Sequence, residues 1–141
     1  MRRRALAGVV LAGVFCFVGC GGPMQPDELK RSIGTLESTA AEGALLADEV
    51  SRDRSKATFV RVHARELGET ADHEAEKLND AQAEAAGGVA PAKVRAIDLA
   101  DQISAQIGRI QVAPGSETEA RAAQKALDDL SKRAGKLAEG L

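Results

Sequence analysis

Aromatic residues are almost absent from this chain of 141 residues, which contains no tryptophan, no tyrosine and three phenylalanines. Phe15 and Phe17 fall within the first 20 residues, so Phe59 is the single aromatic residue in the remainder. Proteins that bind sugars or single-stranded nucleic acids use aromatic side chains as stacking platforms. The composition therefore argues against carbohydrate binding and against base recognition.

Cysteine is equally scarce, since the two cysteines are Cys16 and Cys20. Beyond residue 20 no disulfide can be formed, so packing must stabilise the rest of the chain. Nucleophilic catalysis also lacks its usual sequence signatures, because no serine stands in a nucleophile-elbow or Ser-x-x-Lys pattern. We expect a protein that is not an enzyme.

Histidine occurs twice, at His63 and His73. On one helix the two side chains would lie about 15 Å apart along the axis, too far to bind one metal ion together. No glutamate stands three residues before either of them, so the Glu-x-x-His motif of di-iron bundles is missing. We therefore expect no cofactor, and we expect His63, at the edge of the apolar positions, to take part in helix packing.

A weaker candidate for a metal site surrounds the second histidine. Glu69, His73 and Glu76 recur at i, i+4 and i+7, which places them on one face of a helix. Imidazole and carboxylate groups suit zinc and similar divalent ions. The alternative interpretation is an ordinary solvated acidic face.

The first 20 residues have the order of an export signal. Three arginines at positions 2–4 precede an uncharged stretch over residues 5–18. This stretch matches the apolar core of a signal peptide, about 7–15 residues, and is shorter than the roughly 20 residues of a transmembrane helix. The stretch ends at Val18, and Gly19 and Cys20 follow. With Val18, Gly19 and Cys20 the segment resembles the lipobox of bacterial lipoproteins, although Phe17 stands where leucine is usual.

The resemblance implies cleavage between Gly19 and Cys20, with diacylglycerol on the sulfur of Cys20 and a further acyl chain such as palmitate on its amino group. Two or more acyl chains anchor a protein stably in a membrane. The protein would then be exported and held on the outer face of the cell membrane, or on the outer membrane of a diderm host. Gly21 is not the aspartate that marks inner-membrane retention in enteric bacteria. A plain secretory signal that leaves Cys20 as a free thiol is the alternative.

Charge and spacing indicate what the anchored protein could contact. Residues 20–25 form a tether of about 20 Å at ~3.3 Å per residue. Three of the 19 basic residues are arginines that leave with the signal peptide. The remaining chain has 16 basic and 21 acidic residues, so its net charge becomes −5. Such a chain is not suited to binding nucleic acid or anionic lipid.

We expect the acyl chains to supply the membrane contact and an envelope protein to be the partner, in an interaction, adaptor or structural role. The alternative function is metal or small-ligand binding at the His73 face.

Residues 26–141 show the periodicity of amphipathic helices, with apolar residues three and four positions apart. Four such faces can be read from the sequence: Leu29, Ile33, Leu36, Ala40, Gly43, Ala47 and Val50; Ala57, Val60, Ala64, Leu67, Ala71, Ala75 and Leu78; Val94, Ile97, Ala100, Ile103, Ile107 and Ile110; and Ala120, Ala123, Leu127, Leu130, Ala134, Leu137 and Leu141.

Some of the breaks between these helices are clearer in the sequence than others. A polar run at 51–56 and a change in the phase of the pattern predict a turn there. One continuous helix over 26–86 remains an alternative, because the polar run itself contains no glycine or proline. Gly87 and Gly88 are predicted to stop the second helix, and Pro91 to start the third.

The last helix follows Pro114 and Gly115, where Ser116 and Glu119 fit a capping box. Four helices with short connections predict an all-α fold, an antiparallel up-and-down four-helix bundle over residues 26–141. Its faces are rich in alanine and glycine, which allows close helix packing and leaves little room for a bulky cofactor. The same pattern would suit either a closed monomer or a homo-oligomer completed by a partner helix.

Overall fold

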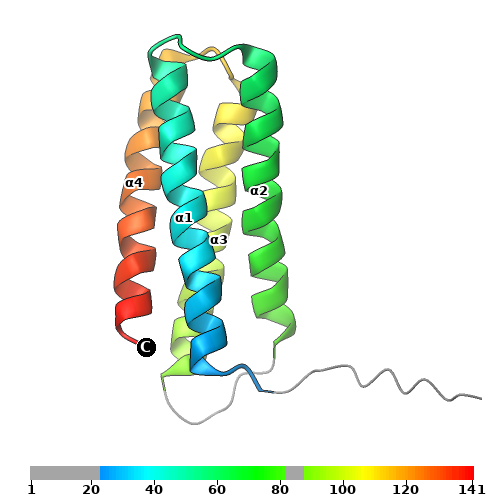
Figure 1. Cartoon of the computed structure of the whole chain (residues 1–141), viewed down its shortest axis with the longest axis vertical. Coiled ribbons are helices and arrows are strands. Elements are labelled where there is room, and N and C mark those ends of the chain that lie inside the picture. The colour runs from blue at the N-terminus through cyan, green and yellow to red at the C-terminus, as the bar shows by residue number, and fades with distance from the viewer. Residues whose placement is uncertain (1–22, 82–87) are drawn as a thin grey trace, which may run out of the picture.

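The structure is a computed structural model that describes residues 23–81 and 88–141. Within these ranges the chain forms four helices, α1 (Pro26–Ser51), α2 (Ala57–Asp80), α3 (Val89–Val112) and α4 (Glu117–Glu139). Successive helices run in opposite directions and pack side by side (Figure 1). The predicted all-α four-helix bundle is confirmed. The predicted signal peptide and Cys20 lie outside the described residues.

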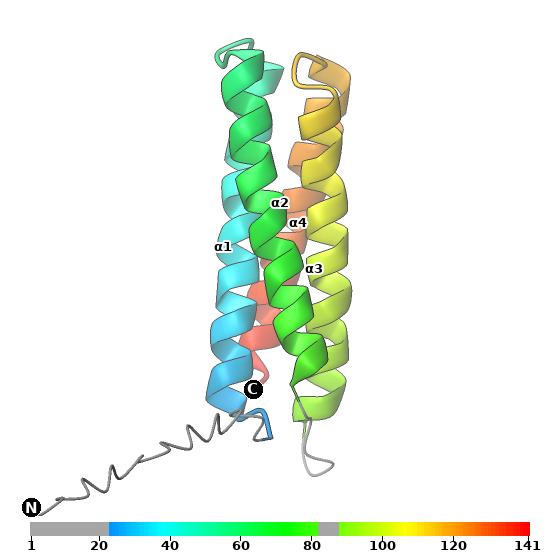
Figure 2. The ribbon, with the colours of Figure 1, turned by 90° about the vertical axis from the view of Figure 1, so that its right-hand side faces the viewer.

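The bundle has two distinct ends (Figures 1 and 2). At one end, α1 and α3 begin and α2 and α4 finish; we call it the tether end, because the chain enters α1 there from residue 23. At the other, the distal end, residues 52–56 connect α1 to α2 and residues 113–116 connect α3 to α4. The 26 residues of α1 span about 39 Å at 1.5 Å per residue, which sets the distance between the two ends.

The four helices do not contact one another equally. α1 packs most closely on α4, and α2 on α3. α1 also approaches α3 across the interior, whereas no Cα atoms of the described helices α2 and α4 lie within 8 Å of each other. The cross-section is therefore a skewed parallelogram with α1 and α3 on its short diagonal.

Gly43 explains how α1 comes so close to its neighbours. A Cβ atom at this position would lie 3.1 Å from Leu127 Cδ1 of α4 and 3.3 Å from Ile107 Cγ1 of α3. Both of these side chains are fully buried. By contrast, a Cβ at Gly34 of the same helix would have no neighbour within 4 Å. The predicted close approach at small residues is thus confirmed at Gly43.

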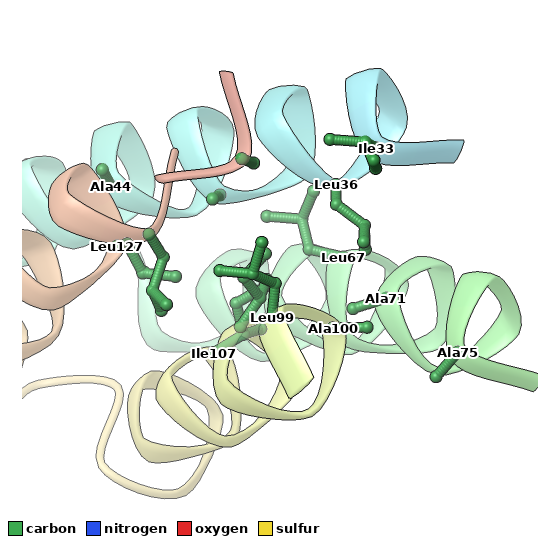
Figure 3. Packing of buried hydrophobic residues seen from close by; sticks show 14 of the residues in the cluster. Ile33, Leu36, Ala44, Leu67, Ala71, Ala75, Leu99, Ala100, Ile107 and Leu127 are labelled. Atoms are coloured by element: carbon green, nitrogen blue, oxygen red, sulfur yellow. The ribbon is translucent and has the colours of Figure 1, made fainter. Parts of the chain in front are cut away.

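The core follows the predicted faces most faithfully in α1, where all seven positions are buried. Figure 3 shows the larger side chains Leu36, Leu99 and Ile107 directed into the interior, with alanines such as Ala71 and Ala100 beside them. Burial of these apolar groups is the main source of stability in such a bundle, because isolated helices are marginal in water.

The predicted face of α3 is wrong in its first half. Val94 is 66% exposed, and Ile97 is only partly buried. The buried positions are Val89, Ala92, Ala96 and Leu99, followed by Ala100 and Ile103 as predicted. The helix turns its alanines inward here because a narrow interior admits small side chains. Ala57 at the start of α2 is also exposed, and Leu137 and Leu141 are partly buried rather than fully.

The break between α1 and α2 confirms the predicted turn and excludes one continuous helix over 26–86. Asp53 adopts a left-handed backbone with φ of 53°. Its amide donates to the Val50 carbonyl, and the amide of Arg54 donates to the Glu49 carbonyl. These two hydrogen bonds form a Schellman motif, which ends the helix without a glycine because aspartate tolerates this conformation better than most residues.

Two helix boundaries differ from the prediction. α2 ends at Asp80, before Gly87 and Gly88. Between Leu78 and these glycines the only apolar residues are alanines, so a longer helix would gain little stability from burying apolar surface. α3 begins at Val89. Pro91 then lies in its first turn, where the missing amide has no helical partner to lose.

The capping box before α4 is only half formed. Ser116 Oγ accepts a hydrogen bond from the Glu119 amide at 3.3 Å, as predicted. The Glu119 carboxylate, however, accepts hydrogen bonds from Arg109 of α3 at 2.8 and 3.0 Å. The Ser116 amide instead donates to the Ala113 carbonyl. An ion pair between two helices has thus replaced the second half of the box.

Candidate functional site

The segment that joins the bundle to the predicted anchor is fixed to the core earlier than its sequence suggested. Met24 is buried, with 2% of its surface exposed. Gln25 is the N-cap of α1 without a side-chain cap, and Pro26 takes the first helical position. Met24 lies four positions after Cys20 along the chain, and the greatest reach of this link is roughly 13 Å instead of 20 Å.

The predicted metal-binding residues lie on the exposed face of α2. Glu69 Oε1 is 3.7 Å from Nε of Arg65, one turn away on the same helix. Among residues 23–81 and 88–141, no three histidine, cysteine, aspartate or glutamate side chains come close enough together to hold a metal ion. Glu69, His73 and Glu76 therefore share a face but do not form a preorganised metal site.

His63 connects α2 to α1, which agrees with its predicted role in packing. Its Nε2 lies 3.0 Å from Glu42 Oε1 on α1, and its Nδ1 lies 3.8 Å from Glu66 Oε2 on its own helix. The imidazole ring also stacks on Phe59, with 5.6 Å between ring centroids. These contacts hold the Phe59 ring in place on the surface beside α1.

Large apolar side chains are exposed mainly near the distal end. Of the five in the described part of the chain, Leu45, Phe59, Val62 and Val112 lie within about 9 Å of the distal ends of their helices, counted at 1.5 Å per residue. Phe59 is 57% exposed and Val62 is 43% exposed. The fifth, Val94, lies near the tether end.

The helical periodicity did not identify these distal residues as an interaction surface. A signal was nevertheless present, since Leu45, Phe59 and Val62 all fall outside the apolar faces of their own helices. A position outside a predicted face does not by itself ensure exposure, because Leu46 also lies outside the face predicted for α1 and is buried. Phe59 stands out further as the single aromatic residue beyond residue 20.

No helix in the described part of the chain combines the length and the apolarity that a membrane crossing requires.

Comparison with protein families, with curated proteins and with solved structures gives no match for this chain.

Proposed function

We propose that this protein is a lipid-anchored module of the bacterial cell envelope that binds another envelope protein through its distal end and has no catalytic role. The anchoring part of the proposal is supported by the order of residues 1–20, in which arginines, an uncharged stretch and the Val18, Gly19, Cys20 triplet follow one another. The acyl chains on Cys20 would hold the protein at the membrane.

The geometry of the bundle supports a role as a spacer with a binding tip. A link of roughly 13 Å keeps the tether end close to the membrane surface. The helices then extend away from that end, and α1 alone spans about 39 Å. The distal end would be presented to proteins elsewhere in the envelope.

The observation that carries the interaction proposal is the concentration of exposed apolar side chains at the distal end. Single exposed apolar residues are normal, whereas contiguous apolar patches mark interaction surfaces. Phe59 and Val62, three residues apart on α2, are neighbours on one face of that helix and form the centre of the proposed contact. Phe59 is well suited to anchor such a contact, because its ring is large and is already oriented by stacking on His63.

Site-specific photo-crosslinking in intact cells tests this proposal. A photoreactive amino acid is placed at position 62 of the full chain, and in a matched chain at position 76, which is exposed on the same helix about 21 Å nearer the tether end. We expect one discrete crosslinked partner from position 62 and none from position 76.

Substitution of the proposed anchor provides the specificity control. Phe59→Ser should abolish the crosslink from position 62, whereas Val94→Ser, which alters an exposed residue near the tether end, should leave it intact. Equal crosslinking from positions 62 and 76, or a crosslink that survives Phe59→Ser, would contradict a binding tip.

A further inference from the structure

A cavity opens between the start of α3 and the last turns of α4, at the tether end of the bundle. Its volume is about 520 Å³, within the range of roughly 300–1,000 Å³ that small-molecule sites occupy. Ala92 and Leu99 of α3, with Leu137 and Leu141 at the end of the chain, form its apolar floor. Such a floor can accept a hydrocarbon chain.

The rim of the cavity is basic, in a protein whose net charge is negative. Arg95, Arg133 and Lys136 line it, with Asp98 as the one acidic residue. The Arg133 guanidinium is already engaged, since Nη2 lies 3.8 Å from Asp98 Oδ2 and Nη1 donates to Gln102 Oε1 at 2.9 Å. Among the residues that the structure describes, the rim therefore keeps two positive charges that are not neutralised.

These two charges belong to Arg95 and Lys136. Both side chains are exposed, and neither forms an ion pair or a hydrogen bond with any residue in the described part of the chain. Lys136 stands in the last turn of α4, where a cation interacts favourably with the helix dipole. Arg95 lies in the second turn of α3, where the dipole provides no such stabilisation.

We infer that this cavity binds a single-chain anionic amphiphile, a molecule of the long-chain fatty acid type. Its carboxylate lies between Arg95 and Lys136, where charge-assisted hydrogen bonds replace the water around both cations. Its alkyl chain lies on the floor against Leu99 and Leu137. A cavity of this size accommodates one chain more readily than the two chains of a membrane phospholipid. The site consists of residues 88–141 and requires neither acylation of Cys20 nor the distal end, so it goes beyond the proposed function.

Photolabelling of the full chain tests the site directly. The protein is incubated with phosphatidylcholine nanodiscs and with palmitic acid that carries a diazirine on its alkyl chain. After illumination, the labelled peptides are located by mass spectrometry. We expect label in the segments 88–99 and 133–141, and about tenfold less label when palmityl alcohol with the same diazirine replaces the acid, because the neutral head loses its charged partners.

Two double variants determine whether the rim charges hold the ligand. Arg95→Gln with Lys136→Gln should reduce labelling by about tenfold, and circular dichroism should show an unchanged helix content. Arg61→Gln with Lys125→Gln removes the same charge from exposed positions outside the cavity and should leave labelling unchanged.

Three results would overturn the inference. The first is label distributed over all four helices, and the second is equal labelling of the wild type and the Arg95/Lys136 variant. The third is selective labelling by a photoreactive two-chain phosphatidylglycerol but not by palmitic acid, which would assign the cavity to the membrane surface.

Discussion

Replacing Gly43 with alanine, next to the same replacement at Gly34, measures how closely α1 is held against α3 and α4. Both changes lie inside α1, and each gains about 1 kcal/mol from the higher helix propensity of alanine. At Gly34 the new methyl group meets nothing within 4 Å, so this gain should appear in full. The two variants differ only in what the methyl group contacts.

At Gly43 the methyl group would lie 3.1 Å from Leu127 and 3.3 Å from Ile107. Both neighbours are fully buried and can move only by displacing other core atoms. Overpacking of this kind costs about 1–3 kcal/mol. Gly34→Ala should therefore exceed Gly43→Ala in unfolding free energy by about 1–3 kcal/mol, and because the propensity gains cancel, the difference reports the packing alone.

Urea denaturation of residues 23–141, followed by circular dichroism, is the assay. Both variants should keep the wild-type dependence on urea, so that the midpoints report stability directly. For a domain of this size 1 kcal/mol corresponds to roughly 3–5 °C in Tm, so a thermal scan should show the same order. If Gly43→Ala were stabilised as much as Gly34→Ala, the three helices would not be in contact at this level and the packing described above would be wrong.

The remaining predictions concern the core and one helix cap. Leu36→Ala and Leu127→Ala should each lower the unfolding free energy by about 2–5 kcal/mol, because both side chains are fully buried; two near-neutral results would contradict a self-sufficient core. Leu99→Ala should be similarly destabilising in urea, whereas Val94→Ala should change the midpoint little, since the inward face of α3 contains Leu99 and not Val94. Ser116→Ala should cost about 1 kcal/mol through loss of its hydrogen bond to the Glu119 amide, and unchanged thermal stability would mean that this cap contributes nothing.

Periodicity predicted the helices well wherever large apolar residues dominate the inward face. In α1, leucine, isoleucine and valine recur with alanine and glycine at regular spacing, and all seven predicted positions are buried. The start of α3 offered two possible faces, one with Val94 and Ile97 and one with Ala92, Ala96 and Leu99. Hydrophobicity alone favoured Val94 and Ile97, whereas the bundle buries the face that combines Leu99 with the two alanines.

Local signals were less reliable where a tertiary contact competes with them. The capping box at Ser116 was readable from the sequence, but Glu119 turns to Arg109, a partner ten residues away on another helix. The end of α1 lacks glycine and proline, so its Schellman motif at Asp53 could not be inferred from residue types alone. The cavity near Arg95 and Lys136 depends on the pairing of α3 with α4, which no local pattern reveals.

The chemical state of Cys20 tests the central claim of a lipid-anchored protein most directly. The protein is isolated from its native membrane, and the mass of its N-terminal peptide is measured. The lipobox resemblance predicts a peptide that begins at Cys20 and carries diacylglycerol on sulfur and an acyl chain on nitrogen. It also predicts that Cys20→Ala moves the protein from the detergent phase to the aqueous phase on phase separation. An unmodified peptide together with unchanged partitioning of Cys20→Ala would contradict lipid anchoring.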